Sequence, residues 1–301
     1  MYIQEKWSSK NSPPGTVVMP IMFHSISGDT SGSTISDSGF HALMQELIKT
    51  GFQTITTSQL ADFLDSNVKI PARSVVLILD DRRPGTVALD FMPYLNDHKW
   101  TLTLAWPIGA GEDSTDKKPA VNVLPGEHFS SLWQQMEAYN ATGRLDIQAH
   151  GVNHNIIMGP DSTDEFLHSE LQGSIDAIRQ HFNKAPIAII WPGGGFTQRA
   201  AEIARPLGYR LGFTVNPRGP VMFNWVPLAD KVQAERATWL AEGPVDDPLM
   251  VLPRYWDTDA SAHIDEVIQV GQEAAAYAGK NKTVEMEYYN IACEAQYGPI
   301  P

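Results

Sequence analysis

VVLILDDRRPG, residues 75–85, joins a run of aliphatic residues to two adjacent carboxylates and two arginines. A continuous aliphatic run of this kind predicts a buried strand of a parallel sheet. The neighbouring charges of Asp80 and Asp81 are unfavourable unless a metal ion or a shared proton offsets them. The stretch therefore predicts a functional site at the end of a strand, although a carboxylate here is also typical of a helix N-cap.

Composition limits the classes of protein that fit. The 301 residues can bury one large α/β domain or two smaller ones, and we expect a single domain of barrel size. With 22 Lys and Arg against 35 Asp and Glu, the net charge of −13 repels nucleic acid and anionic lipid. Cys293 is the only cysteine, so an internal disulfide is excluded and any metal must be held by His and carboxylate.

The chain alternates short β-branched runs with amphipathic segments, which predicts βα units around a parallel sheet. About seven strands followed by helices predict a (β/α) barrel, incomplete or distorted, and no GxGxxG follows the first strand. The predicted strands are VVMPIMF, SVVLIL, TLTLAW, LDIQAH, PIAIIW, LGFTV and LMVLPRY. The predicted helices run over about residues 39–50, 86–96, 128–140, 164–182, 197–206 and 260–278.

Three segments follow from these patterns: a linker over residues 1–16, the barrel over 17–279 and a tail over 280–301. Residues 217–248, rich in Pro and Gly, predict a long loop. No window has the eighteen apolar residues of a membrane span, and the polar opening lacks the apolar segment of a signal peptide. The opening fits the remainder of a processed secreted chain, and it fits a cytoplasmic origin equally well.

Polar or aromatic residues stand at the end of each of several predicted strands. In barrels of parallel strands, catalytic residues come from the carboxyl ends of the strands, so these residues are expected to converge. They are His24, Asp80, Asp81, Trp106, His150, Trp191 and Arg254.

The segment AHGVNHN places His150 and His154 four residues apart. On a helical turn this spacing brings both imidazoles to one face, and one added carboxylate completes a ligand set for a divalent transition metal. One Asp of the pair would then bind the metal while its neighbour serves as general base. Each motif also has a plainer interpretation, because His-x-x-x-His occurs by chance and a lone His24 is often a structural histidine.

Taken together, these motifs resemble the polysaccharide deacetylases of carbohydrate esterase family four, also described as the NodB-homology domain. The resemblance covers about residues 20–268. PIMFHSIS resembles the opening strand of the family, and the segment after it resembles the first helix and turn. VVLILDD resembles the first motif, AHGVNHN the second and WPGGGF the third.

The resemblance implies a role for each matching residue. Asp80 would be the general base and His24 the general acid, and Asp81, His150 and His154 would bind the metal. Zinc is the expected ion, and cobalt, nickel, iron or manganese suit the same ligands. The implied reaction is hydrolysis of N-acetyl groups from an amino-sugar polysaccharide or oligosaccharide by metal-activated water.

The opening PIMFHSIS pattern is similar to extracellular deacetylases of poly-N-acetylglucosamine. The resemblance therefore implies an extracellular or periplasmic location and an N-acetylated glycan as partner, without implying an oligomeric state.

Three positions depart from the family pattern. Arg82 replaces the usual Gly after the Asp pair, Trp191 replaces the usual Arg of the third motif, and Gly151 replaces Ser or Thr in the second. Arg254 or Arg82 is expected to supply the charge that the missing Arg would give the base.

Aromatic residues near the motifs are candidates for a substrate wall, because sugar C–H faces pack on aromatic rings. The candidate substrate-binding residues are Trp191, Pro192, Gly193, Trp256, Trp106 and Arg82, with Trp225 and Tyr255 as further aromatic candidates. Trp191 and Trp256 are preferred, since they flank motif residues. The alternative is that at least two of the aromatic residues belong to the core.

Two other functions remain open. A metal-dependent amidase acting on a small non-peptide amide would keep the same ligands in a closed pocket, whereas a glycan needs an open groove. A carbohydrate-binding barrel without catalysis would have no reason to keep the Asp pair and all three histidines.

Overall fold

The computed structural model describes residues 15–28, 34–66, 68–81, 83–108, 124–153, 156–223, 226–227, 229, 243–292 and 295. Within these ranges no helix is both long and apolar enough to cross a membrane.

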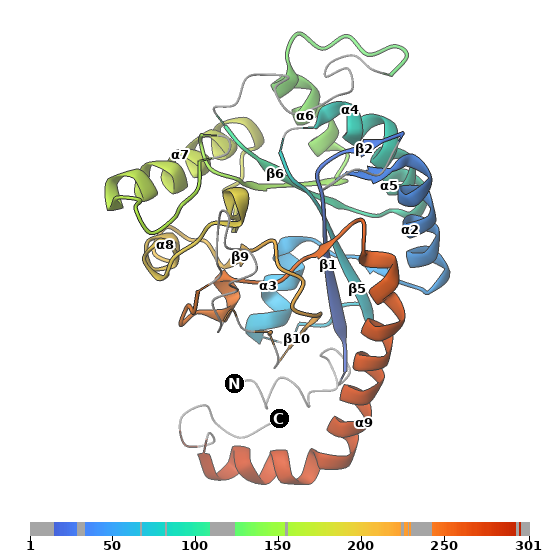
Figure 1. The fold of residues 1–301 in the computed structure, drawn as a ribbon, viewed down its shortest axis with the longest axis vertical. Helices are drawn as coiled ribbons and strands as arrows, with labels where there is room; N and C mark the ends of the chain where they lie inside the picture. Colours follow the sequence, from blue (N-terminus) through green and yellow to red (C-terminus); the bar gives the residue numbers. More distant parts are fainter. Residues whose placement is uncertain are drawn as a thin grey trace.

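A curled parallel sheet forms the centre of the fold (Figure 1). Its neighbouring strands, in order, are β1 (Val17–Phe23), β5 (Arg73–Leu79), β6 (Leu102–Trp106), β7 (Leu145–Ala149), β8 (Ala188–Ile190) and β9 (Leu211–Phe213). Short strands are added at the edges: β10 (Val221–Met222) runs antiparallel to β1, and β4 (Gln53–Thr54) pairs with β5. Strands β2 (Ile26–Ser27) and β3 (Ile35–Ser36) pair with each other.

The two edges of the sheet are joined by residues 252–256. Leu252 makes a parallel bridge to Phe213 of β9, and β11 (Tyr255–Trp256) pairs in parallel with Ile21 and Met22 of β1. The curled sheet is therefore a distorted (β/α) barrel, as the sequence predicted, with the segment before β11 completing its wall.

Most of the helices cover the outside of the sheet (Figure 1), whereas the apolar residues of α3 (Thr57–Ser66) join the cluster on its inner side. Several helices begin directly after a Ser or Thr whose hydroxyl accepts an N–H three residues on, which stabilises the first turn. The helices are α2 (Asp37–Lys49), α3 (Thr57–Ser66), α4 (Pro84–Thr86), α5 (Met92–His98), α6 (Leu132–Ala141), α7 (Asp164–Phe182), α8 (Gln198–Ala204) and α9 (Ala260–Ala292). A π-helical turn, Val87–Phe91, joins α4 to α5, and two 3-10 turns, Pro192–Gly194 and Pro248–Met250, follow β8 and precede β11.

The structure agrees with most of the predicted elements. All seven predicted strands coincide with strands or, for LMVLPRY, with the segment that leads into β11. The sequence analysis missed α3, and α9 continues to Ala292 rather than ending near residue 278. Of the loop predicted over 217–248, the described part contains only the short β10 as regular structure, and residues 230–242 lie outside the described residues.

Strand residues alternate between two hydrophobic clusters, as the pleat of a strand requires. One cluster lies between the sheet and the surrounding helices and contains Val17, Met19 and Ile21 of β1. The other contains Val18 of β1, Leu252, and apolar residues of α3, and it fills the inner side of the curled sheet. This alternation decides which strand-end side chains reach the inner face and which join the helix layer.

We predict that Gly212→Ala lowers the free energy of unfolding by about 1–3 kcal/mol, the usual effect of overpacking. A Cβ at Gly212 would lie 2.1 Å from the carbonyl oxygen of Met250, on the segment that joins the sheet edges. Urea unfolding of the variant measures the loss. Gly243→Ala is the control, because its Cβ would meet no atom within 4 Å, and equal stability of the two variants would contradict the prediction.

Candidate active site

The ends of β1 and β5 bring the predicted base and acid together. Phe23 and Leu79 are partners in the parallel register, and the N–H of Asp80 donates to the carbonyl of Phe23 at 2.8 Å. His24 and Asp80 therefore continue the inner face of adjacent strands. The His24 Nε2 lies 3.7 Å from the Asp80 Oδ2, and both side chains point to the carboxyl end of the sheet.

Asp80 forms a bidentate ion pair with Arg254, and both side chains are buried. The two guanidinium nitrogens lie 2.6 and 2.9 Å from the carboxylate oxygens, and the Arg254 Nε donates to the carbonyl of Thr214 at 2.6 Å. Burial alone would raise the pKa of Asp80, but the charge and hydrogen bonds of Arg254 outweigh it and lower the pKa. Asp80 is therefore held ionised although its side chain is buried.

Asp81 turns back toward the same site and takes a different partner. Its φ of +63° is left-handed, a conformation that Asp adopts more readily than most residues. One carboxylate oxygen accepts a hydrogen bond from Arg83 at 2.7 Å, and the other lies 3.6 Å from the His150 Nε2. The left-handed turn lets two consecutive carboxylates face one site, although strand alternation would separate them.

His150 is oriented by the backbone. Its Nδ1 lies 2.7 Å from the carbonyl oxygen of Ile190, which accepts a hydrogen bond only if Nδ1 carries the proton. In the neutral ring, the Nε2 then faces Asp81 with a lone pair, the arrangement typical of a metal-binding histidine. In the metal-free protein, burial lowers the pKa of His150, but Asp81 and Asp80 outweigh burial and raise it.

The described residues place two of the three predicted metal ligands together. The 3.6 Å between the Asp81 Oδ1 and the His150 Nε2 can be bridged by one ion, since such ligand atoms bind zinc at about 2.0–2.2 Å. His154 lies outside the described residues, and within the described ranges no three His, Cys, Asp or Glu side chains are placed so that they could hold a metal ion together. The donor set fits a divalent metal, and His154 as third ligand stays a prediction.

His24 lies between the acidic pair and an aromatic ring. Its imidazole stacks on Trp256 at 5.7 Å between ring centroids, and its Nδ1 is buried without a hydrogen-bond partner in the described part of the chain. Burial lowers the pKa of His24, and Asp80 and Asp81 only partly oppose this effect. A proton held by His24 is therefore released easily, as a general acid requires.

The predicted substrate wall is only partly in place. Trp106 and Trp191 are 0% exposed and lie in the cluster between sheet and helices, because Ala105 and Ile190 take the inner positions beside them. The Trp191 Nε1 donates to the carbonyl of Met250 at 2.8 Å. Both indoles are thus core residues in the structure, a correction to the expectation that they contact sugar.

The remaining predicted substrate residues differ in exposure. Trp256 is half-buried beside His24, Pro192 is buried and Gly193 is half-buried, whereas Tyr255 lies in the core. Arg82 and Trp225 lie outside the described residues. Of the aromatic candidates that the structure describes, Trp256 keeps a position suited to a substrate.

Sequence reasoning missed Arg83, Asp257 and Glu170. Arg83 was visible in the opening stretch, but the sequence gives no sign that it, rather than Arg82, reaches Asp81. Asp257 follows β11 and is 2% exposed, and neither of its carboxyl oxygens meets the geometry of a hydrogen bond with another described group. Glu170 lies on the face of α7 that carries Leu167 and Leu171, a buried position that the helical spacing could have revealed.

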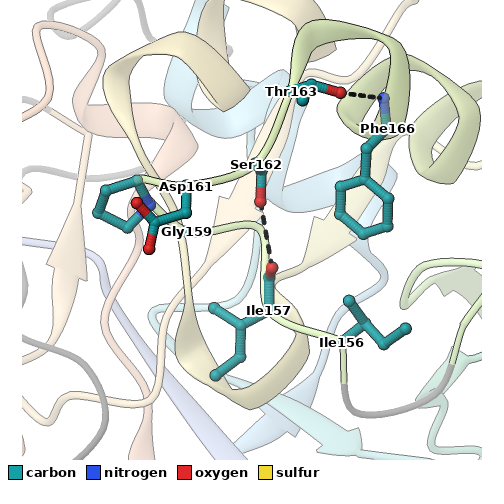
Figure 2. Close-up of a pocket in the computed structure, with 8 residues that line it drawn as sticks. Ile156, Ile157, Gly159, Asp161, Ser162, Thr163 and Phe166 are labelled. Carbon is teal, nitrogen blue, oxygen red and sulfur yellow. Dashed lines mark hydrogen bonds between the residues drawn. The ribbon is translucent and has the colours of Figure 1, made fainter.

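A hollow of about 500 Å³ lies beside the loop that follows the two histidines (Figure 2). Ile156, Ile157 and Phe166 give it apolar walls, and Ser162 and Thr163 hold its shape by hydrogen bonds to the backbone. Ile157 also packs toward Gly193 of the WPGGGF segment, where a Cβ would lie 3.1 Å from it. The hollow is open to solvent and adjoins the second and third motifs.

Residues 67–212 match the family model described as polysaccharide deacetylase. The Bacillus subtilis (strain 168) protein YxkH is 23% identical over 197 residues, which are 65% of this chain and 64% of that protein. The chain thus matches slightly less than two thirds of the length of that relative.

Solved structures share the fold. The Streptococcus pyogenes deacetylase PplD, determined in complex with acetate, has a TM-score of 0.59 at 18% identity, covering 80% of this chain and 92% of its own. IcaB from Ammonifex degensii has a TM-score of 0.58 at 18% identity, covering 88% and 99%. These likenesses confirm the predicted fold, a distorted (β/α) barrel.

Asp257 should make stability depend on pH. Burial raises its pKa to about 8, and although the Thr258 N–H lowers the pKa, Asp80 adds to the rise. Between about pH 4 and this value the folded protein holds a proton that the unfolded chain releases, so the free energy of unfolding falls as pH rises, by at most about 1.4 kcal/mol per unit.

We expect Asp257→Asn to remove this contribution. Urea unfolding of the native chain and the variant, at about pH 5 and about pH 8 with a chelator present, measures it. The variant should gain stability relative to the native chain at the higher pH. If the free energies of unfolding of the native chain and the variant differed by the same amount at both pH values, Asp257 would have an ordinary pKa and the prediction would be contradicted.

Proposed function

We propose that the chain, whose residues 67–212 match the polysaccharide deacetylase family model, removes N-acetyl groups from an amino-sugar glycan by metal-dependent hydrolysis. The family match agrees with the family that the sequence resembles and supports the hydrolase class. Metal dependence, the substrate and the residue roles are the proposal. The observation that carries it is the separation of two adjacent carboxylates, with Asp80 paired to Arg254 and Asp81 facing His150.

The metal would be held by Asp81, His150 and His154. When bound, a divalent ion supplies Lewis-acid chemistry, since it lowers the pKa of water and polarises the acetamide carbonyl. His150 presents its Nε2 because the carbonyl of Ile190 occupies its Nδ1. Arg83 pairs with the Asp81 oxygen that faces away from His150, so that the other oxygen remains directed into the site.

Asp80 acts as the general base in the proposed reaction. Arg254 keeps its carboxylate ionised and fixes its plane by two hydrogen bonds, so the base is oriented before substrate binds. Asp80 accepts a proton from the attacking water as the oxygen bonds to the carbonyl carbon. The bidentate pair replaces the support that the third motif of the family usually gives through the position that Trp191 occupies here.

His24 delivers a proton to the leaving nitrogen when the C–N bond breaks, which gives acetate and a free amino sugar. Its position 3.7 Å from Asp80 gives the abstracted proton a short route to that nitrogen. Stacking on Trp256 holds the imidazole plane, and the same indole offers an apolar face beside the reacting group.

An open substrate surface supports a glycan over a small amide. The hollow beside Ile157 is open to solvent and carries apolar faces on which sugar C–H groups pack. We further propose that the enzyme acts outside the cytoplasm, where such polymers occur.

The Asp80→Asn variant tests the role of the base without changing a predicted metal ligand. We expect the variant to keep about one metal ion per chain while acetate release from N-acetylglucosamine oligomers falls about 100-fold or more, the usual effect of losing a general base. His150→Ala is the matched control, and it should lose the metal together with activity. Metal analysis and an acetate assay on the native chain and both variants make the test, and near-native turnover in Asp80→Asn would contradict the mechanism.

A further inference from the structure

We propose that Glu170 of α7 is a positioning residue that fixes the loop between the two histidine ligands and so sets the affinity for the metal. This inference rests on the proposed function, because it concerns the metal that His150 and His154 would hold. It assigns a role to a buried charge that lies outside the residues of the reaction itself.

Glu170 is 1% exposed, which is rare for a carboxylate unless it is paired or hydrogen-bonded. Among the described residues, the hydrogen-bond partners of its carboxylate all belong to the loop. The Oε2 accepts the N–H of Val152 at 2.8 Å and that of Asn153 at 2.9 Å, and the Oε1 accepts the side-chain amide of Asn153. The carboxylate therefore accepts hydrogen bonds from Val152 and Asn153, the two residues that directly precede His154.

A second contact holds the loop on the same face of α7. Gly173 lies one helical turn after Glu170, and a Cβ there would lie 2.6 Å from the Val152 Cγ2. The absence of a side chain at Gly173 thus lets Val152 approach the helix. Glu170 and Gly173 together hold the loop on α7. Glu170 does so by hydrogen bonds, and Gly173 by allowing the close approach of Val152.

Gly151 completes the fit between loop and helix. Its φ is +79°, and a Cβ there would lie 3.0 Å from the Glu170 Oε2. The loop is also tied at this residue to the end of β6, because the Ile108 N–H donates to the Gly151 carbonyl at 3.1 Å. Gly151 departs from the family pattern of Ser or Thr, and in this chain the neighbouring Glu170 carboxylate provides the anchor for the loop.

The contacts with Glu170 order the loop before the metal binds. His150 is fixed by its own hydrogen bond to Ile190, whereas His154 follows a loop whose described hydrogen bonds include those to Glu170. Without these bonds the loop samples other conformations. Ordering the loop when the metal binds then costs conformational entropy, which lowers the affinity for the metal. Partners of this kind, one step from the ligands, typically change metal affinity about 10–100-fold.

The test uses Zn²⁺ binding to the metal-free full chain, measured by competition with a chromophoric chelator. Glu170→Gln removes the charge and turns one of the two acceptor oxygens into a donor, so it cannot accept both the backbone N–H groups and the side-chain amide of Asn153, and we expect Zn²⁺ affinity to fall about 10–100-fold. Glu165→Gln is the matched control, because it removes the same charge from an exposed position on the same helix. The control should bind Zn²⁺ as the native chain does.

A second variant keeps the test decisive if Glu170→Gln folds poorly. Gly173→Ala leaves all charges in place and raises helix propensity, yet its Cβ displaces Val152, so Zn²⁺ affinity should also fall. Thermal unfolding of the metal-free variants separates loop positioning from general damage, and the visible absorption of bound Co²⁺ reports whether coordination changes.

Native Zn²⁺ affinity in both folded variants would overturn the role of Glu170 while leaving the proposed function intact. An equal loss of affinity in Glu165→Gln would also overturn it, since the effect would then be one of charge alone. A native chain that takes up no Zn²⁺ would overturn the proposed function and this inference together.

Discussion

The buried ion pair between Asp80 and Arg254 is the interaction on which the rest of the site depends. Asp80 directly follows β5 beside β1, and Arg254 lies on the segment that joins β9 to β1, so the pair links the closure of the sheet to the charge of the proposed base. Removing both charges from water is costly, and bidentate geometry with a third bond to Thr214 is what offsets that cost. The closure of the sheet and the ionised state of Asp80 therefore rely on the same contact.

The Asp81 carboxylate is stabilised independently of Asp80, which explains how two adjacent carboxylates can follow an apolar strand. Asp81 has its own cation in Arg83 and turns into the site through a left-handed residue. Two adjacent carboxylates can then remain ionised in one site with different roles, without sharing a proton. The hydrogen bond between His150 and Ile190 serves the proposed metal site in the same way, because it leaves the other ring nitrogen available to bind an ion.

Strand order and the polar strand ends could be predicted because hydrophobic runs and their terminal residues are local signals. The burial of Trp106 and Trp191 could also have been predicted, since neighbouring strand residues point to opposite faces and each Trp directly follows a residue of the inner face, Ala105 or Ile190. The partner of Asp81 and the burial of Asp257 could not, because they depend on a left-handed turn and on contacts between distant segments. Helix α3 was not predicted because it is short and its apolar residues pack on the inner side of the sheet. That packing cannot be recognised from a short sequence pattern.

The division of roles between the two carboxylates is the central claim, and an anomalous-scattering map of crystals grown with Zn²⁺ tests it most directly. The account predicts one peak about 2.0–2.2 Å from the Asp81 Oδ1 and the His150 Nε2, with Asp80 still paired to Arg254. A peak coordinated by Asp80 in place of Asp81, or the absence of any peak at this edge of the sheet, would contradict it.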